Sequence, residues 1–420
     1  MRRRLLLSCG PWIGFALVLL LAPLAWPGGF ALTVLSQVGI AIILCLSYNL
    51  LFGEGGMLSF GHAVHSGAGA YAAILALDHI AQGTLVLPVS LVPLAGGLAG
   101  LAVAAAVGWA CTRHGGTAFA MITLGLGELV GAMVLMLPQV FGGEGGRSAS
   151  RVVGPEVLGI SFGPQRQLCL LIALYCLACT ALMFAFTRTS AGLLLNAVRD
   201  NAERVGFLGH SAHRIRWQAF MIAGFFAGIA GGLAALDLET VTAEVVSAQR
   251  SGAVLLFVLL GGSGVFFGPI LGAVLMVGSA LLLPTWTRAG TLYLGLLFMV
   301  TVIAAPGGLA GLLVALRRAA ACPRRRPLLG AGIGLAGTAL CALAGLTALV
   351  ELLYQRQLDA VGGAPAHLLG VPLDAAQADA WVGAALVMLT GAGLFAQAWG
   401  PWRRQWAAAA ETDTRPGRSA

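Results

Sequence analysis

The chain contains no lysine, and all 24 of its basic residues are arginine. A P-loop needs a lysine to reach the terminal phosphates of a nucleotide, so the chain has no GxxxxGK[ST] motif and cannot be a P-loop ATPase. The same absence excludes lysine Schiff-base chemistry. The GxSxG motif of serine hydrolases and the HExxH motif of zinc proteases are also missing. The sequence therefore gives little support to an enzyme.

Charge of either sign is scarce as well. Charged residues make up 10% of the 420 residues, hydrophobic residues make up 59%, and the mean hydropathy is +0.91. One soluble core could not bury so much apolar surface. Nearly uncharged stretches such as Leu168 to Phe186 reach the ~20 residues that a bilayer core requires. They lack the alternation of barrel strands, so the sequence predicts an all-α, polytopic membrane helical bundle.

The apolar stretches predict twelve spans, with about ten in a core and two in a C-terminal extension. The predicted spans are residues 11–27, 30–52, 59–80, 84–112, 117–141, 166–187, 215–238, 246–262, 265–284, 290–313, 328–353 and 380–400. We expect the first stretch to stay as an uncleaved span rather than act as a signal peptide. Glycines interrupt residues 53–60 and 261–264. Both places are candidates for broken or re-entrant helices, whose non-helical backbone usually lines a cavity.

The arginines fall unevenly on the two sides of this topology. With the N-terminus inside, eighteen arginines lie on the cytoplasmic side and six on the other side. Such a bias follows the positive-inside rule, so both termini are predicted to be cytoplasmic. The net charge of +8 is therefore a topology signal. A nucleic-acid partner is not expected, because it would need basic residues gathered on one soluble face.

The longest polar interruption of the apolar sequence is Thr187 to Arg216. It contains a helical register in which residues such as Leu195 and Val198 are apolar, while Arg199, Asp200 and Glu203 are polar. The register predicts a short amphipathic helix on the cytoplasmic side. Such a helix can lie on the membrane surface, or it can dock a soluble motor.

This segment resembles the coupling loop of the branched-chain amino acid permeases of the LivM type, which belong to ATP-binding-cassette importers of hydrophobic amino acids and amides. Further stretches resemble the same family in the same order, at residues 46–71, 121–130, 217–236, 255–275 and 292–313. Together they cover about residues 30–313. The resemblance implies a permease core at residues 1–316 and leaves residues 317–420 as an accessory region.

The resemblance also implies what surrounds the chain. It implies an inner-membrane permease paired with a second, homologous permease, two cytoplasmic ATPase subunits that bind ATP and Mg²⁺, and a periplasmic substrate-binding protein. The chain itself is expected to need no cofactor. The substrate is left open between branched-chain or other hydrophobic amino acids and urea or short amides. An ion-coupled secondary transporter is a rival class.

Two groups of candidate site residues follow from the resemblance. Residues assigned to coupling with the ATPase are Gly192, Arg199, Asp200, Glu203 and Gly206. Candidates for the translocation pathway are Glu128, His62, Ser59 and Asn49. Glu128 lies mid-span, where a charge is costly, so it should face the bundle or a watery path, or join helices while protonated. His62 and His65 without a third ligand do not indicate a metal site.

Two sets of glycines repeat every four residues. They are Gly224, Gly228 and Gly232 in one stretch, and Gly264, Gly268 and Gly272 in another. Small residues at this spacing let helix backbones approach closely in lipid, so both sets are predicted to pack helices. Movement at these contacts during alternating access is a further hypothesis.

Overall fold

The computed structural model describes residues 2–153, 161–286, 290–304, 307–321, 326–359, 366–368, 371–373 and 378–413. Apart from two short antiparallel strand pairs, the regular secondary structure of the described part is helical, and this confirms the predicted all-α class. The pairs are β1 (Arg147–Ser148) with β2 (Thr240–Val241), and β3 (Ala366–Leu368) with β4 (Val371–Leu373). The chain clusters into two compact units, residues 1–278 with 301–310 and residues 279–300 with 311–420.

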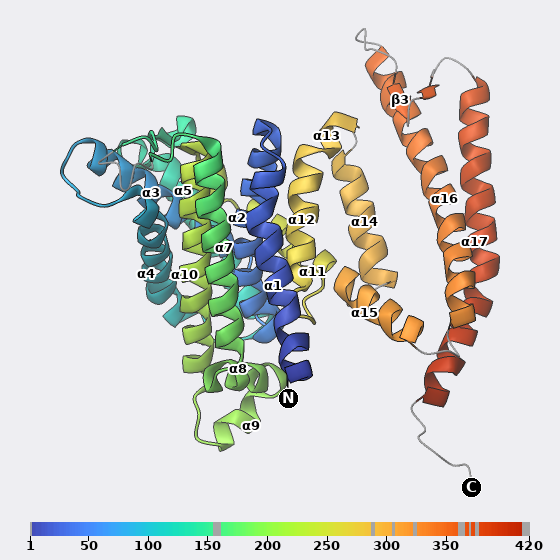
Figure 1. The fold of residues 1–420 in the computed structure, drawn as a ribbon, viewed down its shortest axis with the longest axis horizontal. Coiled ribbons are helices and arrows are strands. Elements are labelled where there is room, and N and C mark those ends of the chain that lie inside the picture. The colour runs from blue at the N-terminus through green and yellow to red at the C-terminus, as the bar shows by residue number, and fades with distance from the viewer. Residues whose placement is uncertain are drawn as a thin grey trace. The chain divides into compact units, whose positions relative to one another are not determined.

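Each predicted span corresponds to helical structure (Figure 1). The first unit contains α1 (Arg2–Ala25), α2 (Gly29–Asn49), α3 (His62–Ala81), α4 (Val92–Cys111), α5 (Gly116–Met136), α6 (Pro138–Phe141), α7 (Gln165–Thr187), α8 (Ser190–Asp200), α9 (Ala202–Phe207), α10 (Ala212–Leu238), α11 (Ala248–Gly261) and most of α12 (Gly268–Leu281). Short 3-10 or π turns follow or precede these helices at η1 (Leu50–Glu54), η2 (Val89–Leu91), η3 (Gly143–Gly145) and η4 (Ala243–Val246).

Among the described residues, seven helices are long and apolar enough to cross a membrane. They are Gly29–Glu54, Val89–Cys111, Gly116–Met136, Gln165–Thr187, Ala212–Leu238, Gly337–Tyr354 and Ala378–Arg404. The predicted spans 246–262 and 265–284 are shorter than expected, because α11 and α12 have 14 residues each. At 1.5 Å per residue each covers roughly 21 Å, less than a bilayer core.

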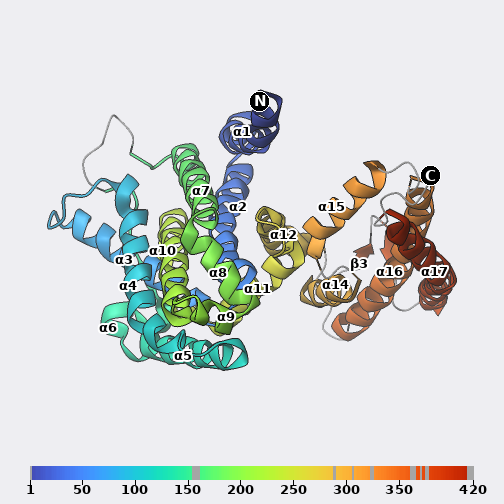
Figure 2. The ribbon, with the colours of Figure 1, turned by 90° about the horizontal axis from the view of Figure 1, so that it is seen from below.

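Helix α10 forms the centre of the first unit. In its apolar window 78% of the residues are buried, compared with 28% for α5. Figure 2 shows α10 between α4 on one side and α2 on the other. The two small helices α8 and α9 lie at the same end of this unit as the N-terminus (Figure 1). Helix α10 thus supplies the packing core, whereas α5 leaves most of its surface open in this chain.

Both predicted glycine breaks are present. After η1 ends at Glu54, residues 56–61 are non-helical until α3 begins at His62. Helix α11 ends at Gly261, where Gly262 adopts a φ of 103°, and α12 begins at Gly268. The predicted span 290–313 is not one helix, because α14 ends at Ala304 and α15 (Gly308–Ala321) starts separately. Gly308, with a φ of 65°, packs against the backbone of Gly262, which places this second start beside the α11–α12 break.

The second unit contains α13 (Leu283–Trp286), α14 (Gly290–Ala304), α16 (Arg326–Asp359) and α17 (Ala378–Asp413). Helices α16 and α17 pair closely, because Gly345 lies against Met388 and Gly391 lies against Ala342. The hydroxyl of Tyr293 donates to the buried carboxylate of Glu351 at 3.2 Å, which joins α14 to α16. The predicted boundary between a core and an accessory region at residue 317 stays a prediction.

Candidate functional site

The non-helical segment before α3 is held by side chains of three other elements. The hydroxyl of Tyr48 on α2 donates to the carbonyl of Ser59 at 2.8 Å. The amide of Phe60 donates to Thr123 on α5 at 3.1 Å. The amide of Ala63 donates to Ser251 on α11 at 2.9 Å. These bonds satisfy backbone groups that have no helical partner, which is the condition for irregular backbone at membrane depth.

A buried polar cluster surrounds the start of α3. Nε2 of His62 is 2.9 Å from the hydroxyl of Ser47. The His62 ring contacts the rings of Tyr48 and His65 edge to face, and His65 contacts Phe220 on α10 in the same way. Ser59 and His62 are both fully buried, and Tyr48 contacts both of them. The structure therefore brings His62 and Ser59 together inside the bundle.

Several atoms in this region have no hydrogen-bond partner among the described residues. They are Nδ1 of His62, both ring nitrogens of His65 and Oδ1 of Asn49. Asn49 is buried beside Gly53, where a Cβ would overlap its side-chain oxygen. Buried polar groups of this kind commonly bind water or a passing polar ligand. Within the described residues, no three His, Cys, Asp or Glu side chains gather as a metal site would require.

Glu128 does not join this cluster. Its side chain is exposed on α5, on the same surface as Met121 and Leu129, which are 68% and 59% exposed. The opposite face of α5, with Thr123 and Gly127, packs into the unit. The sequence predicted that Glu128 faces the bundle or a watery path. In the first unit it faces outward, away from the cluster around His62.

The predicted amphipathic helix over residues 191–206 is divided in two. Asn201 adopts an extended conformation with φ −159° and ψ 100°, which ends α8. Its side chain then accepts from the amide of Arg204 at 2.9 Å and caps α9. Asparagine is among the best N-cap residues, which explains why the second helix begins there. Gly192 is buried where a Cβ would overlap the Phe186 carbonyl, whereas Gly206 has open space around it.

The apolar side of α8 faces its own bundle. Leu195 and Val198 are fully buried, and the apolar residues left exposed are Leu193, Phe207 and Leu208. Asp200 and Glu203 are exposed beside them. The sequence predicted that this amphipathic helix lies on the membrane surface or docks a soluble motor, and either role would use its apolar face. Instead, the free apolar surface comes from the opposite side of α8 and from the end of α9.

Two side chains of α8 hold the broken end of α2. The guanidinium of Arg199 donates to the carbonyl of Gly53, and the amide of Asn196 donates to the Glu54 carboxylate at 2.8 Å. Gly56 adopts a φ of 63°, and the Arg199 side chain lies where its Cβ would be. Arg199 also reaches Asp200 at 3.3 Å. These contacts link α8 to residues 53–56, which lead directly to Ser59 and His62.

The first glycine set lies where α10 meets α4. A Cβ on Gly224 would overlap Ala104, a Cβ on Gly228 would overlap the Gly96 carbonyl, and Gly232 lies against Pro93. The second set lies at the α11–α12 break. There Gly268 and Gly272 pack against the backbone of Gly261, but Gly264 has open space around it. Gly264 thus lies in the turn and outside the packed contact.

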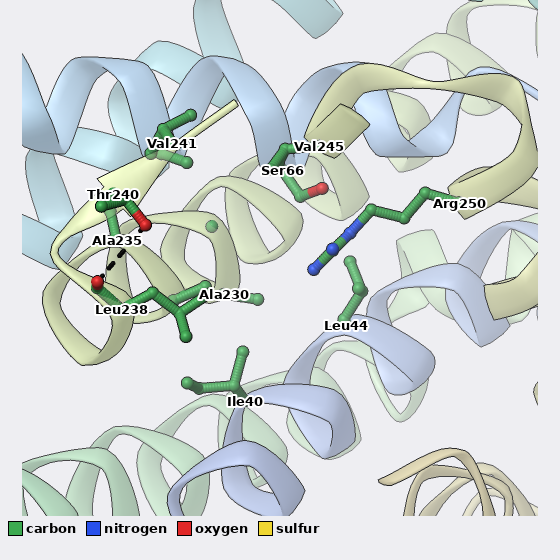
Figure 3. Close-up of a pocket in the computed structure, with 13 residues that line it drawn as sticks. Ile40, Leu44, Ser66, Ala230, Ala235, Leu238, Thr240, Val241, Val245 and Arg250 are labelled. Carbon is green, nitrogen blue, oxygen red and sulfur yellow. Dashed lines mark hydrogen bonds between the residues drawn. The ribbon is translucent and has the colours of Figure 1, made fainter. Parts of the chain in front are cut away.

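One cavity contains Arg250, which the predicted topology counts among the six arginines on the non-cytoplasmic side. Arg250, in the first turn of α11, extends into a pocket between α2, α3 and α10 (Figure 3). The cavity measures about 30 Å³ and is lined mainly by apolar side chains. The signal that could have found it is an arginine inside the apolar predicted span 246–262, because a charge at such a place is a functional-site hypothesis by default.

A polytopic helical bundle with broken helices inside it, one of them bound to helix α8, is an arrangement expected of a membrane transport protein. The comparison with known families agrees, and the chain belongs to the family described as the permease component of branched-chain amino acid transport systems, which residues 30–306 match.

Two relatives are high-affinity branched-chain amino acid transport system permease proteins LivM. The protein from Salmonella typhimurium is 30% identical over 321 residues, which cover 70% of this chain and 74% of the relative. The protein from Escherichia coli is 29% identical over 323 residues, with the same coverage. No solved structure matches the chain. The matched region contains the breaks, α8 and α9, whereas residues 307–420 lie beyond the family match.

Proposed function

We propose that this chain is the membrane-spanning permease subunit of an ATP-binding-cassette importer of branched-chain amino acids. The observation that carries the proposal is the contact of α8 with the broken end of α2, because it connects an exposed helix to the buried polar segment around His62. Both relatives are named for branched-chain amino acids, which favours that substrate class over urea or short amides. Uptake of labelled leucine by the assembled importer tests it.

The ATPase is proposed to be a separate pair of chains that bind ATP and Mg²⁺, because a chain without lysine has no P-loop. Its docking surface on the permease would be Leu193, Phe207 and Leu208, with Asp200 and Glu203 beside them. An apolar centre with charges at its rim is the usual composition of a specific interface. Closure of the ATPase dimer would push α8, and α8 would move residues 53–56.

A second permease is proposed to cover α5. The exposed side of α5 is apolar except for Glu128, and a lone carboxylate facing lipid at this depth would be costly. Contact with a second permease would place Glu128 between the two chains, where a translocation pathway can be polar. A periplasmic binding protein would deliver the substrate at the end of the unit opposite α8 and α9.

The orientation in the inner membrane gives the first testable prediction. We expect the end with α8 and α9 to be cytoplasmic, because it carries most of the arginines of the first unit. A reporter active only in the cytoplasm should give signal when inserted after Gly209 and none when inserted after Ala149. An insertion after Gly83 serves as a second outside control. The opposite pattern of signals would contradict the proposed orientation.

A further inference from the structure

The cavity around Arg250 is built by separate segments of the first unit. Its wall contains Ile40 and Leu44 of α2, Ser66 and Ala70 of α3, and small residues of α10 from Ala230 to Ala235. Leu238, Thr240 and Val241 form the side nearest the end of α10, and Leu238 and Thr240 are exposed. Figure 3 shows the guanidinium of Arg250 directed inward, toward Ser66, Leu44 and Ala230. The cavity is therefore an apolar recess with one cationic group at its inner end.

The Arg250 guanidinium has no partner in the described part of the chain. Its Nε is buried without a hydrogen-bond partner, and the arginine takes part in none of the ion pairs found there. Glu244 acts on it electrostatically but lies beyond ion-pair distance and is itself exposed. Only the backbone amide of Arg250 is engaged, donating to the Ser247 hydroxyl at 3.2 Å. Arg250 is partly buried and Glu244 lies beyond ion-pair distance, so an anionic group from outside the chain would stabilise the guanidinium.

The size and lining of the cavity limit which anionic group could bind Arg250. A volume of about 30 Å³ holds roughly two waters. A carboxylate has a similar size and matches the two parallel donors of a guanidinium. The recess is too small for a whole amino acid, so an aliphatic side chain would extend along Ile40, Val241 and Leu238 toward the mouth. A carboxylate attached to a compact apolar body fits this arrangement.

We propose that Arg250 binds the carboxylate of the transported amino acid, and that the recess between α2, α3 and α10 is a substrate subsite within the permease. This inference rests on the proposed function, since it assigns a subsite for the same substrate class. An anionic lipid headgroup offers the same charge, so the experiment must distinguish the two sources.

The position also connects the subsite to the polar cluster. The amide of Ala63, one turn before Ser66 on α3, donates to Ser251, the residue that follows Arg250. Gly231 lies against the Ser66 carbonyl and fixes α10 at the same level. A movement of residues 53–61 that displaces α3 would thus have to carry Ser251 and the neighbouring Arg250 with it or break this hydrogen bond. Binding and release of the carboxylate can therefore follow the state of the broken helix.

Photo-crosslinking with photo-leucine, the diazirine analogue of leucine, tests the subsite on the complete importer. In the wild-type complex we expect crosslinks on the segments that line the recess, at residues 40–44 and 235–245, and competition by leucine. Arg250→Gln should lower this labelling at least tenfold, and Arg250→Lys should keep part of it. Arg166→Gln, at an exposed arginine of α7, is the matched control and should label as the wild type does. The primary amide of photo-leucine should not label the recess.

Three results would overturn the inference. They are absence of labelling in these segments of the wild-type complex, equal labelling by the amide, and wild-type labelling of Arg250→Gln. Loss of a bound anionic lipid from Arg250→Gln in native mass spectrometry, with photo-leucine labelling unchanged, would assign the arginine to lipid instead. Leucine uptake by the same wild-type complex distinguishes failure of the subsite from failure of the proposed function. Uptake of leucine without labelling of the recess would contradict the subsite alone.

Discussion

Alanine at Gly231 or Gly228 is expected to destabilise the membrane domain strongly. A Cβ on Gly231 would overlap the Ser66 carbonyl of α3, and a Cβ on Gly228 would overlap the Gly96 carbonyl of α4. Neither obstacle is a flexible side chain, so helices must separate to make room. Overpacking of a well-packed core costs typically about 1–3 kcal/mol, and each substitution should have at least that cost because backbone is displaced.

Thermal unfolding of the detergent-purified protein measures this effect. Gly231→Ala and Gly228→Ala should lower the melting temperature by several degrees and reduce the yield of monodisperse protein. Gly125→Ala on α5 is the matched control, because a Cβ there meets nothing within 4 Å. The control should unfold at or slightly above the wild-type temperature, since alanine favours helix over glycine. Equal stability of all three variants would contradict the close packing of α10.

Removal of the Arg199 side chain is expected to uncouple transport without detaching the ATPase. Arg199 donates to the Gly53 carbonyl at the broken end of α2, and its position on α8 makes it the transmitting residue. Hydrogen bonds to charged groups contribute roughly 1.5–3 kcal/mol, which is about a tenfold change or more in an equilibrium constant. Arg199→Ala should therefore lower uptake per hydrolysed ATP about tenfold while the ATPase still co-purifies.

A second pair of variants tests docking on the same helices. Phe207→Asp and Asp200→Arg change exposed residues at the proposed ATPase surface, and they should reduce co-purification of the ATPase. Arg214→Ala, at an exposed arginine of α10 near α9, should leave both readouts unchanged. The assignment of transmission to Arg199 and of docking to Phe207 would be contradicted if Arg199→Ala released the ATPase. It would also be contradicted if Phe207→Asp kept the ATPase bound and only lowered uptake per hydrolysed ATP.

Local sequence was sufficient for most of the helices and for two of the breaks, but not for the separation of α14 from α15. Apolar length predicted the spans, and the glycines at 53–56 and 261–264 predicted the interruptions, because these properties depend on neighbouring residues. The division at Asn201 was missed, although asparagine is a strong N-cap residue. The apolar register of 191–202 gave no reason to prefer a break over a continuous helix. A short polar residue within such a register can therefore be the N-cap of a second helix.

Long-range partners could not be predicted in the same way. The sequence showed that α8 would be amphipathic, but the buried face was decided by its contact with Gly55 and Gly56, about 140 positions earlier. The network that joins Asp237 to Gln37 and Gln165, at 2.6 and 2.7 Å, is equally nonlocal. The recess of Arg250 is formed by α2, α3, α10 and α11, which are far apart in the sequence.

ATP-dependent uptake of leucine is the measurement that tests the central claim most directly. The complex is purified from its native membrane by a tag on this chain and reconstituted in vesicles with its binding protein. The account predicts that a second permease and an ATPase co-purify, and that labelled leucine enters only with hydrolysable ATP. Isoleucine and valine should compete, whereas urea and acetamide should not. Leucine uptake driven by an ion gradient without ATP, or ATP-driven uptake of urea in place of leucine, would contradict it.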